Sequence, residues 1–262
     1  MKKLLLLLQL TTLLGLGSCG FTGLFLKEKN IYLKSYKDYS SQDYIQHLGF
    51  LGERYLKTPN VKIYKLSGRS KKYLSKIYKK IIENNELIFK QKERPKIYII
   101  KDEVPFYFSL PGANFFFSLG LIKSYMKNEG VLIACFAFEI LKSLRNIYPK
   151  KILYPKGFAT TGEMLALTRL PFGIKVNLHK WTFNILKRSN YDPYSHLIWM
   201  QIQNKNPLDF SFQHGHNNKV IREEYFLKNY ILKEIGPLEK KQLVEKNSSR
   251  EFYNFLESLK KS

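Results

Sequence analysis

The chain has 262 residues and a formal net charge of +23, with 44% hydrophobic and 15% aromatic residues. This apolar content can bury a core, which excludes an intrinsically disordered chain, and the length fits one sizeable domain with short appendages. The lysines are spread over the whole sequence and no nucleic-acid-binding module is recognisable, so nucleic acid is not an expected partner.

The N-terminus has the layout of a secretory signal peptide. A charged start, Met1-Lys2-Lys3, precedes an apolar run from Leu4 to Leu16, which is shorter than the roughly 20 apolar residues that span a bilayer. The run ends in Leu16-Gly17-Ser18-Cys19, which resembles the lipobox of bacterial lipoproteins. That resemblance implies a signal peptide over residues 1–18 and a lipid, such as palmitate, on Cys19. The alternative is an ordinary signal peptide followed by a cysteine through coincidence.

Cleavage before Cys19 leaves 244 of the 262 residues, and the loss of Lys2 and Lys3 lowers the formal charge from +23 to +21. We therefore expect a protein of the bacterial envelope, periplasmic or at the cell surface, that is held to a membrane by its lipid. Anionic lipid headgroups would add about 1 kcal/mol of attraction for each basic group near the membrane. Cys135 is then the one remaining thiol, so no internal disulfide is expected, and its apolar neighbours indicate a buried packing residue.

The first half of the mature chain predicts two helices followed by three strands. Residues 19–40 have a mixed composition and are expected to form a tether with little structure. Helices are predicted over 41–57, where Lys57-Thr58-Pro59-Asn60 ends the pattern, and over 69–90. Their apolar faces consist of Tyr44, Ile45, Leu48 and Leu51 in the first helix, and of Tyr73, Ile77, Ile81 and Ile82 in the second. Strands are predicted for Lys96–Ile100, Phe106–Leu110 and Asn114–Ser118, the last two on either side of Pro111-Gly112.

The second half predicts mainly helices. The run Val131–Leu141 is apolar nearly all round, which is typical of a central buried helix, and helices over 175–188 and 219–233 follow. Residues 157–162 are small and polar, which favours a connection, with a mobile loop over a cleft as the alternative. A capping box at Ser248-Ser249-Arg250-Glu251 predicts a last helix with Phe252, Phe255, Leu256 and Leu259 on one face.

These elements predict an α+β domain over residues 41–235, mostly helical, with a small β-sheet beside a central buried helix. Residues 236–262 are expected to form a helical tail outside that domain.

Four motifs follow one another between residues 60 and 235. They are Leu110-Pro111-Gly112-Ala113-Asn114-Phe115-Phe116-Phe117 with Gly120-Leu121-Ile122; Asn128-Glu129-Gly130 before a helix with Ala137-Phe138-Glu139; Asn190-Tyr191-Asp192-Pro193; and Gly215-His216-Asn217. This series resembles the zinc metallopeptidases of the HtpX and BepA kind, peptidase family M forty-eight. The resemblance implies a zincin-like metallopeptidase fold, and it places His216 at a histidine of that family. The alternative is an unrelated α/β domain with a Pro-Gly turn.

The residues that bind zinc in the resembling family are replaced in this chain. The family's zinc helix carries two histidines at i and i+4 with a general-base glutamate between them, and a later helix supplies a glutamate as third ligand. The corresponding zinc-ligand positions are Phe138, Lys142 and Lys175, and the general base alone is retained, as Glu139. Phenylalanine has no lone pair to donate and an ammonium group repels a metal cation.

A catalytic zinc site needs about three protein ligands, so we expect no metal, no other cofactor and no catalytic residue. A relocated metal site is a weaker alternative, and its candidate ligands are His179, His196, His214 and His216. Glu139 is instead expected to form a buried ion pair, either with Lys142 on the same helix or with Lys175 on the facing helix. The alternative is that Glu139 and Lys142 meet at a solvated surface.

The sequence therefore predicts a lipid-anchored pseudo-metallopeptidase that binds unfolded or envelope polypeptides without cleaving them, as a chaperone or adaptor. In the resembling family the strand after Pro-Gly borders the cleft, so Phe115, Phe116 and Phe117 are the candidate peptide-binding strand. The alternative is that all three pack in the core. Two other functions remain open, an active zinc metallopeptidase with atypical ligands and a structural or adhesive surface lipoprotein.

Overall fold

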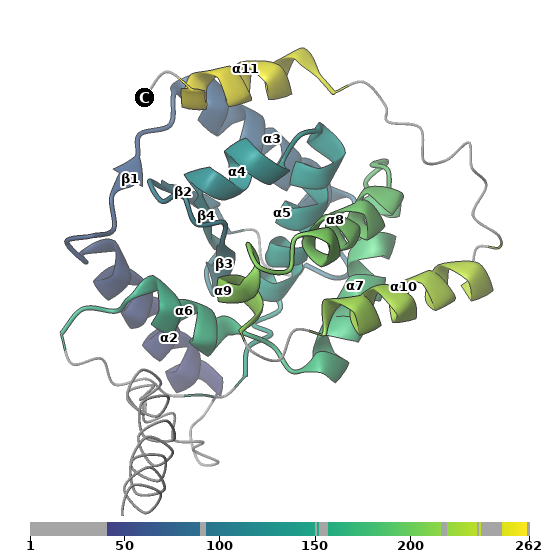
Figure 1. Ribbon diagram of the computed structural model, residues 1–262, viewed down its shortest axis with the longest axis horizontal. Coiled ribbons are helices and arrows are strands. Elements are labelled where there is room, and N and C mark those ends of the chain that lie inside the picture. The colour runs from purple at the N-terminus through teal and green to yellow at the C-terminus, as the bar shows by residue number, and fades with distance from the viewer. Residues whose placement is uncertain are drawn as a thin grey trace, which may run out of the picture.

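The computed structural model describes residues 41–89, 93–149, 151, 157–215, 219–234, 236 and 248–260 (Figure 1). The predicted signal peptide, Cys19, the tether and His216 lie outside the described residues. None of the described helices has the length and hydropathy needed to cross a bilayer. The described part is α+β, as predicted, with a majority of helical residues and one small sheet.

The sheet contains the three predicted strands and one short strand that was not predicted. Its order is β1 (Ile63–Tyr64), β2 (Lys96–Ile100), β4 (Asn114–Ser118) and β3 (Tyr107–Leu110). Strand β4 runs parallel to β2 and antiparallel to β3, so β4 is a central strand and β3 is an edge strand. The turn between β3 and β4 requires positive φ at Gly112 (78°) and Ala113 (54°), a conformation that glycine adopts readily.

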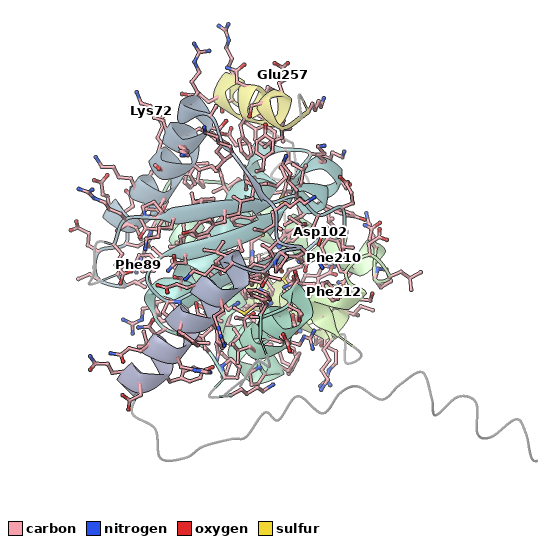
Figure 2. The ribbon with its side chains drawn as sticks, turned by 90° about the vertical axis from the view of Figure 1, so that its left-hand side faces the viewer. Lys72, Phe89, Asp102, Phe210, Phe212 and Glu257 are labelled. Atoms are coloured by element: carbon pink, nitrogen blue, oxygen red, sulfur yellow. The ribbon has the colours of Figure 1, made fainter. Side chains whose placement is uncertain are left out.

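Helices cover both faces of the sheet because the side chains of β4 alternate between two apolar clusters. Phe115 and Phe117 point toward α3 (Gly68–Glu83) and α5 (Glu129–Leu144). Phe116 points to the other face, where its ring stacks on Phe108 and where α2 (Ser41–Leu56) and α6 (Thr161–Thr168) pack. In both views the sheet separates α3 from α2 and α6 (Figures 1 and 2).

A second group of helices packs on the side of α5 away from the sheet. Both α7 (Phe172–Arg188) and α8 (Tyr194–Lys205) contact α5, and α10 (Val220–Glu234) packs across α7 and α8. Their shared core contains Phe183, Leu197, Met200, Leu227 and Ile231. Helix α5 is therefore covered on all sides, and the prediction of a central buried helix is confirmed.

The C-terminal helix α11 (Arg250–Lys260) belongs to the main core, contrary to the expected separate tail over 236–262. Phe252, Phe255 and Leu259 are buried in the same cluster as α3 and α5, because the apolar stripe of α11 lies on α3. Figure 2 shows Lys72 of α3 and Glu257 of α11 at the same end of the molecule.

The cap of α11 also differs from the predicted one. Ser249 caps the helix by accepting from Phe252 N, and the Ser249 backbone N–H donates to Glu129 on α5 rather than to Glu251. Glu129 further accepts from the hydroxyls of Ser249 and Tyr73 at 2.8 Å each. One carboxylate thus joins the start of α5 to α3 and α11.

Several helices were not predicted from the sequence. They are α4 (Leu119–Tyr125), α6, α8 and the four-residue α9 (Ser211–His214). Helix α6 starts inside the expected 157–162 connection, because Thr160 and Glu163 form a reciprocal capping box. The second predicted helix ends at Glu83, seven residues early, where Asn84 caps it.

Candidate functional site

The retained glutamate lies in the middle of α5 and forms a buried ion pair. Glu139 Oε2 is 3.2 Å from Lys142 Nζ, and the two residues are only 1% and 4% exposed. Residues at i and i+3 on a helix are neighbours on one face, which explains how a single helix supplies both charges. The predicted pairing of Glu139 with Lys142 is confirmed. The Lys142 ammonium also lies 5.7 Å from the centre of the Tyr148 ring.

Lys175 does not pair with Glu139, so that alternative is wrong. Its ammonium contacts Glu223 Oε1 at 3.0 Å, because α10 packs against α7 and brings a buried carboxylate to Lys175. Glu223 is 3% exposed. Lys142 and Lys175 therefore each have their own carboxylate.

Two histidines extend the Glu223 pair into a buried chain of polar groups. His179 Nε2 lies 3.3 Å from Glu223 Oε2, and His179 Nδ1 lies 2.9 Å from His196 Nε2. When the Nε2–H of His179 donates a hydrogen bond to Glu223, the Nδ1 of His179 carries no proton. It then accepts a hydrogen bond from the Nε2–H of His196. Phe138 stacks on both imidazoles, with ring centroids 5.0 Å from His179 and 5.9 Å from His196. Phe138 thus packs against this histidine pair.

The charge states follow from burial and from these contacts. Burial alone would raise the pKa of Glu223, but the hydrogen bond from His179 and the charge of Lys175 outweigh burial and lower that pKa to about 2. Burial lowers the pKa of His179, and it lowers the pKa of His196 further, with the neighbouring His179 adding to the effect. At neutral pH the site therefore combines an ionised Glu223 with neutral His179 and His196.

A small cavity with charged and apolar walls lies between the two ion pairs. Its volume is about 40 Å³, which is room for two or three waters. Each ion pair contributes residues to the wall, as do α6, α8 and α9. Two buried ring nitrogens have no hydrogen-bond partner among the described residues, His196 Nδ1 and His214 Nε2. Burial, and then the charge of Lys175, lower the pKa of His214 to about 3, so this imidazole is neutral as well.

The donor set around the cavity does not fit zinc. Within the described ranges, no three histidine, cysteine or acidic side chains are arranged to hold a metal ion. The Glu139 carboxylate is already bound to an ammonium, and His179 and His196 are bonded to each other rather than converging on a common point. The relocated-metal alternative has no support from the described histidines, and His216 is not among them.

The candidate peptide-binding strand is placed differently from the prediction. Phe115, Phe116 and Phe117 are buried in β4, whose two edges are already bonded to β2 and β3. A polypeptide cannot add to a strand that has no free edge, so this prediction is wrong and the core-packing alternative holds. The residues of a strand do not indicate which strands lie beside it, because that depends on the topology of the whole sheet.

The edge strand β3 borders the cavity instead. The outward N–H of Tyr107 donates to Gln213 Oε1 at 3.0 Å, so a side chain of α9 occupies one backbone position of that edge. Arg169 holds α9 in place by donating to the carbonyls of Gln213 and Phe212. Figure 2 labels Phe210 and Phe212, which precede and follow the start of α9, the first buried and the second 40% exposed.

The sequence analysis missed three residues of the site, Glu223, Gln213 and Arg169. Glu223 had a usable signal, because it is an acidic residue on the otherwise apolar inner stripe of the predicted 219–233 helix. Such a carboxylate needs a cation, and no acidic residue occurs between 164 and 191 to serve Lys175. Gln213 and Arg169 carry no comparable pattern.

Comparisons with known proteins add no relative. No protein-family model matches the chain, and no curated protein matches it. The similarity to family M forty-eight therefore rests on the motifs quoted above.

The buried pair on α5 predicts strongly non-additive mutants. Glu139→Ala should lower the free energy of unfolding by about 3–5 kcal/mol, because the Lys142 ammonium stays buried without a partner. Glu139→Leu combined with Lys142→Met should recover most of that loss, since apolar side chains of similar volume replace both charges. Urea denaturation measures both.

The control is Lys79→Ala, in an exposed i,i+4 pair with Glu83 at 3.6 Å, which should cost no more than about 0.5 kcal/mol. Small, additive losses at Glu139 and Lys142 would contradict the buried pair.

Acid should unfold the protein through its buried imidazoles and Glu223. A folded pKa of about 3 for His214 means that the unfolded chain binds more protons below pH 6.5, so stability falls as the pH drops from there. Glu223, with a folded pKa of about 2, stabilises fully above pH 4.5 and loses that contribution as the pH falls toward 2.

His214→Gln should therefore flatten the stability curve between pH 6.5 and 4.5 by up to about 1.4 kcal/mol per pH unit. Denaturation at a series of pH values tests this, and an unchanged slope would count against a buried neutral imidazole.

Proposed function

We propose that this chain is a lipid-anchored, non-catalytic polypeptide-binding protein of the bacterial envelope, a chaperone or adaptor built on a zincin-like metallopeptidase fold. The proposal combines the lipobox-like Cys19 with the family resemblance and with the altered site on α5. It assigns no catalytic residue and no metal.

The observation that carries the loss of catalysis is the Glu139–Lys142 pair. A general base must have its carboxylate free to accept a proton from the nucleophilic water. In this chain the ammonium of Lys142 lies 3.2 Å from that carboxylate, in the interior, where pulling the pair apart is costly. Phe138, stacked on His179, fills a further position that the resembling family gives to a metal ligand.

The polypeptide site supported best is the edge of β3, in place of the β4 strand expected from the sequence. Strand addition uses main-chain hydrogen bonds. The outward N–H of Tyr107 already donates such a bond to a side-chain acceptor, Gln213 Oε1. That acceptor is on a four-residue helix, and a peptide carbonyl is chemically equivalent to the amide oxygen it would replace. An extended polypeptide would therefore bind here by displacing α9.

Two other candidate functions remain, and each has a distinct signature. An active peptidase with atypical ligands requires stoichiometric metal in the purified protein and new termini in its substrate. A structural or adhesive lipoprotein requires attachment through its surface and no affinity for extended polypeptides.

Polypeptide binding is expected without cleavage. The full chain should bind a reduced and alkylated, permanently unfolded protein and leave it intact in mass spectrometry. Gln213→Ala should bind it about two- to ten-fold more tightly, because the Tyr107 N–H loses its competing acceptor, a bond worth about 0.5–1.5 kcal/mol.

The matched control is Gln201→Ala on α8, whose amide bonds Glu224 away from β3, and it should leave the affinity unchanged. Metal-dependent cleavage that disappears in Glu139→Gln would instead identify an active peptidase.

Cys19 is expected to carry the lipid. The mature protein should partition into detergent and incorporate labelled fatty acid, and Cys19→Ala should abolish the label. Labelling that persists in Cys19→Ala would remove the anchor from the proposal while leaving polypeptide binding untouched.

A further inference from the structure

Helix α10 has apolar residues on its outer side as well as on its inner side. Ile221 is 74% exposed, Tyr225 62%, Leu232 48% and Phe226 40%. Positions 221, 225 and 232 recur at helical spacing, so they form one row along the helix. The inner row, Val220, Glu223, Leu227 and Ile231, packs against α7 and α8. We call this row, together with Phe226 on the flank of the helix beside Phe172, the outer face of α10.

The outer face is not required by the fold. A surface helix of a globular protein normally presents charged and polar residues to solvent, and apolar residues exposed in a row mark a binding surface more often than isolated ones do. The packing of α10 is already supplied by its inner row. The outer face therefore points to a partner that accepts an isoleucine, a leucine and two aromatic rings.

Basic residues lie along one flank of this face. Lys219, Arg222 and Lys233 are exposed on or beside α10, and the Arg222 guanidinium lies 4.9 Å from the centre of the Phe172 ring. Two of the three carboxylates of the helix are engaged elsewhere, since Glu223 is buried against Lys175 and Glu224 pairs with Lys228 at 2.5 Å, and Glu234 is exposed at the end of the helix. The exposed charge beside the apolar row is thus mainly positive.

We infer that the outer face of α10 docks onto an anionic phospholipid surface. Apolar and aromatic side chains flanked by lysine and arginine are the composition of helices that lie in the membrane interface. The aromatic rings of Tyr225 and Phe226 suit the headgroup level, and the flanking cations match anionic headgroups. Charge complementarity favours this partner over a second copy of the chain, which is itself strongly basic.

This docking is independent of polypeptide binding and of lipid attachment at Cys19. A helix lying on the bilayer would add a second contact to that of the lipid, and stable attachment generally takes two such signals. It would also fix the orientation of the domain relative to the membrane.

The test places a fluorescent reporter on the outer face and another elsewhere. In a Trp181→Phe background, which removes an exposed tryptophan, Tyr225→Trp is compared with Tyr253→Trp, since Tyr253 is 51% exposed on α11. Helices α10 and α11 lie at different edges of the molecule (Figure 1). The full chain is mixed with vesicles of phosphatidylcholine and phosphatidylglycerol whose acyl chains are brominated.

Emission from Tyr225→Trp should shift to the blue and be lost to bromine quenching, whereas emission from Tyr253→Trp should not. Adding Arg222→Gln to the Tyr225→Trp protein should weaken its affinity for the vesicles, as followed by bromine quenching, about five-fold. Equal quenching at both positions, or none at Tyr225→Trp, overturns the inference. A blue shift without quenching that grows with protein concentration also overturns it, because that result identifies a second copy of the chain as the partner.

Discussion

The burial of Glu139 is the constraint on which the arrangement around α5 depends. The helix is covered by the sheet and α3 on one side and by α7 and α8 on the other, so a carboxylate at its centre has no access to bulk water. An isolated ion there would cost several kcal/mol. Lys142, one turn along the same helix, pairs with the Glu139 carboxylate. Lys175 therefore has to pair with a different carboxylate. Glu223 on α10 meets that need, and α10 is thereby fixed against α7 by charge as well as by packing.

The arrangement around the cavity consists of two separate ion pairs. A metal ion would draw ligands from different helices to a single point. Here the polar groups are connected in sequence instead, from Lys175 through Glu223 and His179 to His196. The cavity that remains is too small for more than a few waters. This series of contacts links α7 to α10 and to α8 through buried polar groups.

The sequence predicted the elements with strong periodicity, and it failed where structure depends on distant partners. The three longer strands, α3 and α5 were visible from their own residues, because burial of one face or of the whole helix leaves a pattern. The position of Phe115–Phe117 at the centre of the sheet was not visible, since it depends on which strands lie alongside. The pairing of Glu139 with Lys142 is local and was predicted. The pairing of Lys175 with Glu223 spans 48 residues and needs the packing of α10 on α7 to be known first.

The hydrogen bonds of Glu129 join segments that are far apart in the sequence. Three of its contacts reach Ser248 and Ser249, about 120 residues further along, and a fourth reaches Tyr73 on α3. The surface of α3 that receives Phe252, Phe255 and Leu259 is therefore uncovered until α11 has been synthesised and has docked. A chain truncated before residue 248 would leave an apolar groove on α3 open to other unfolded chains. Helix α11 therefore shields apolar surface of α3 that would otherwise be exposed to solvent.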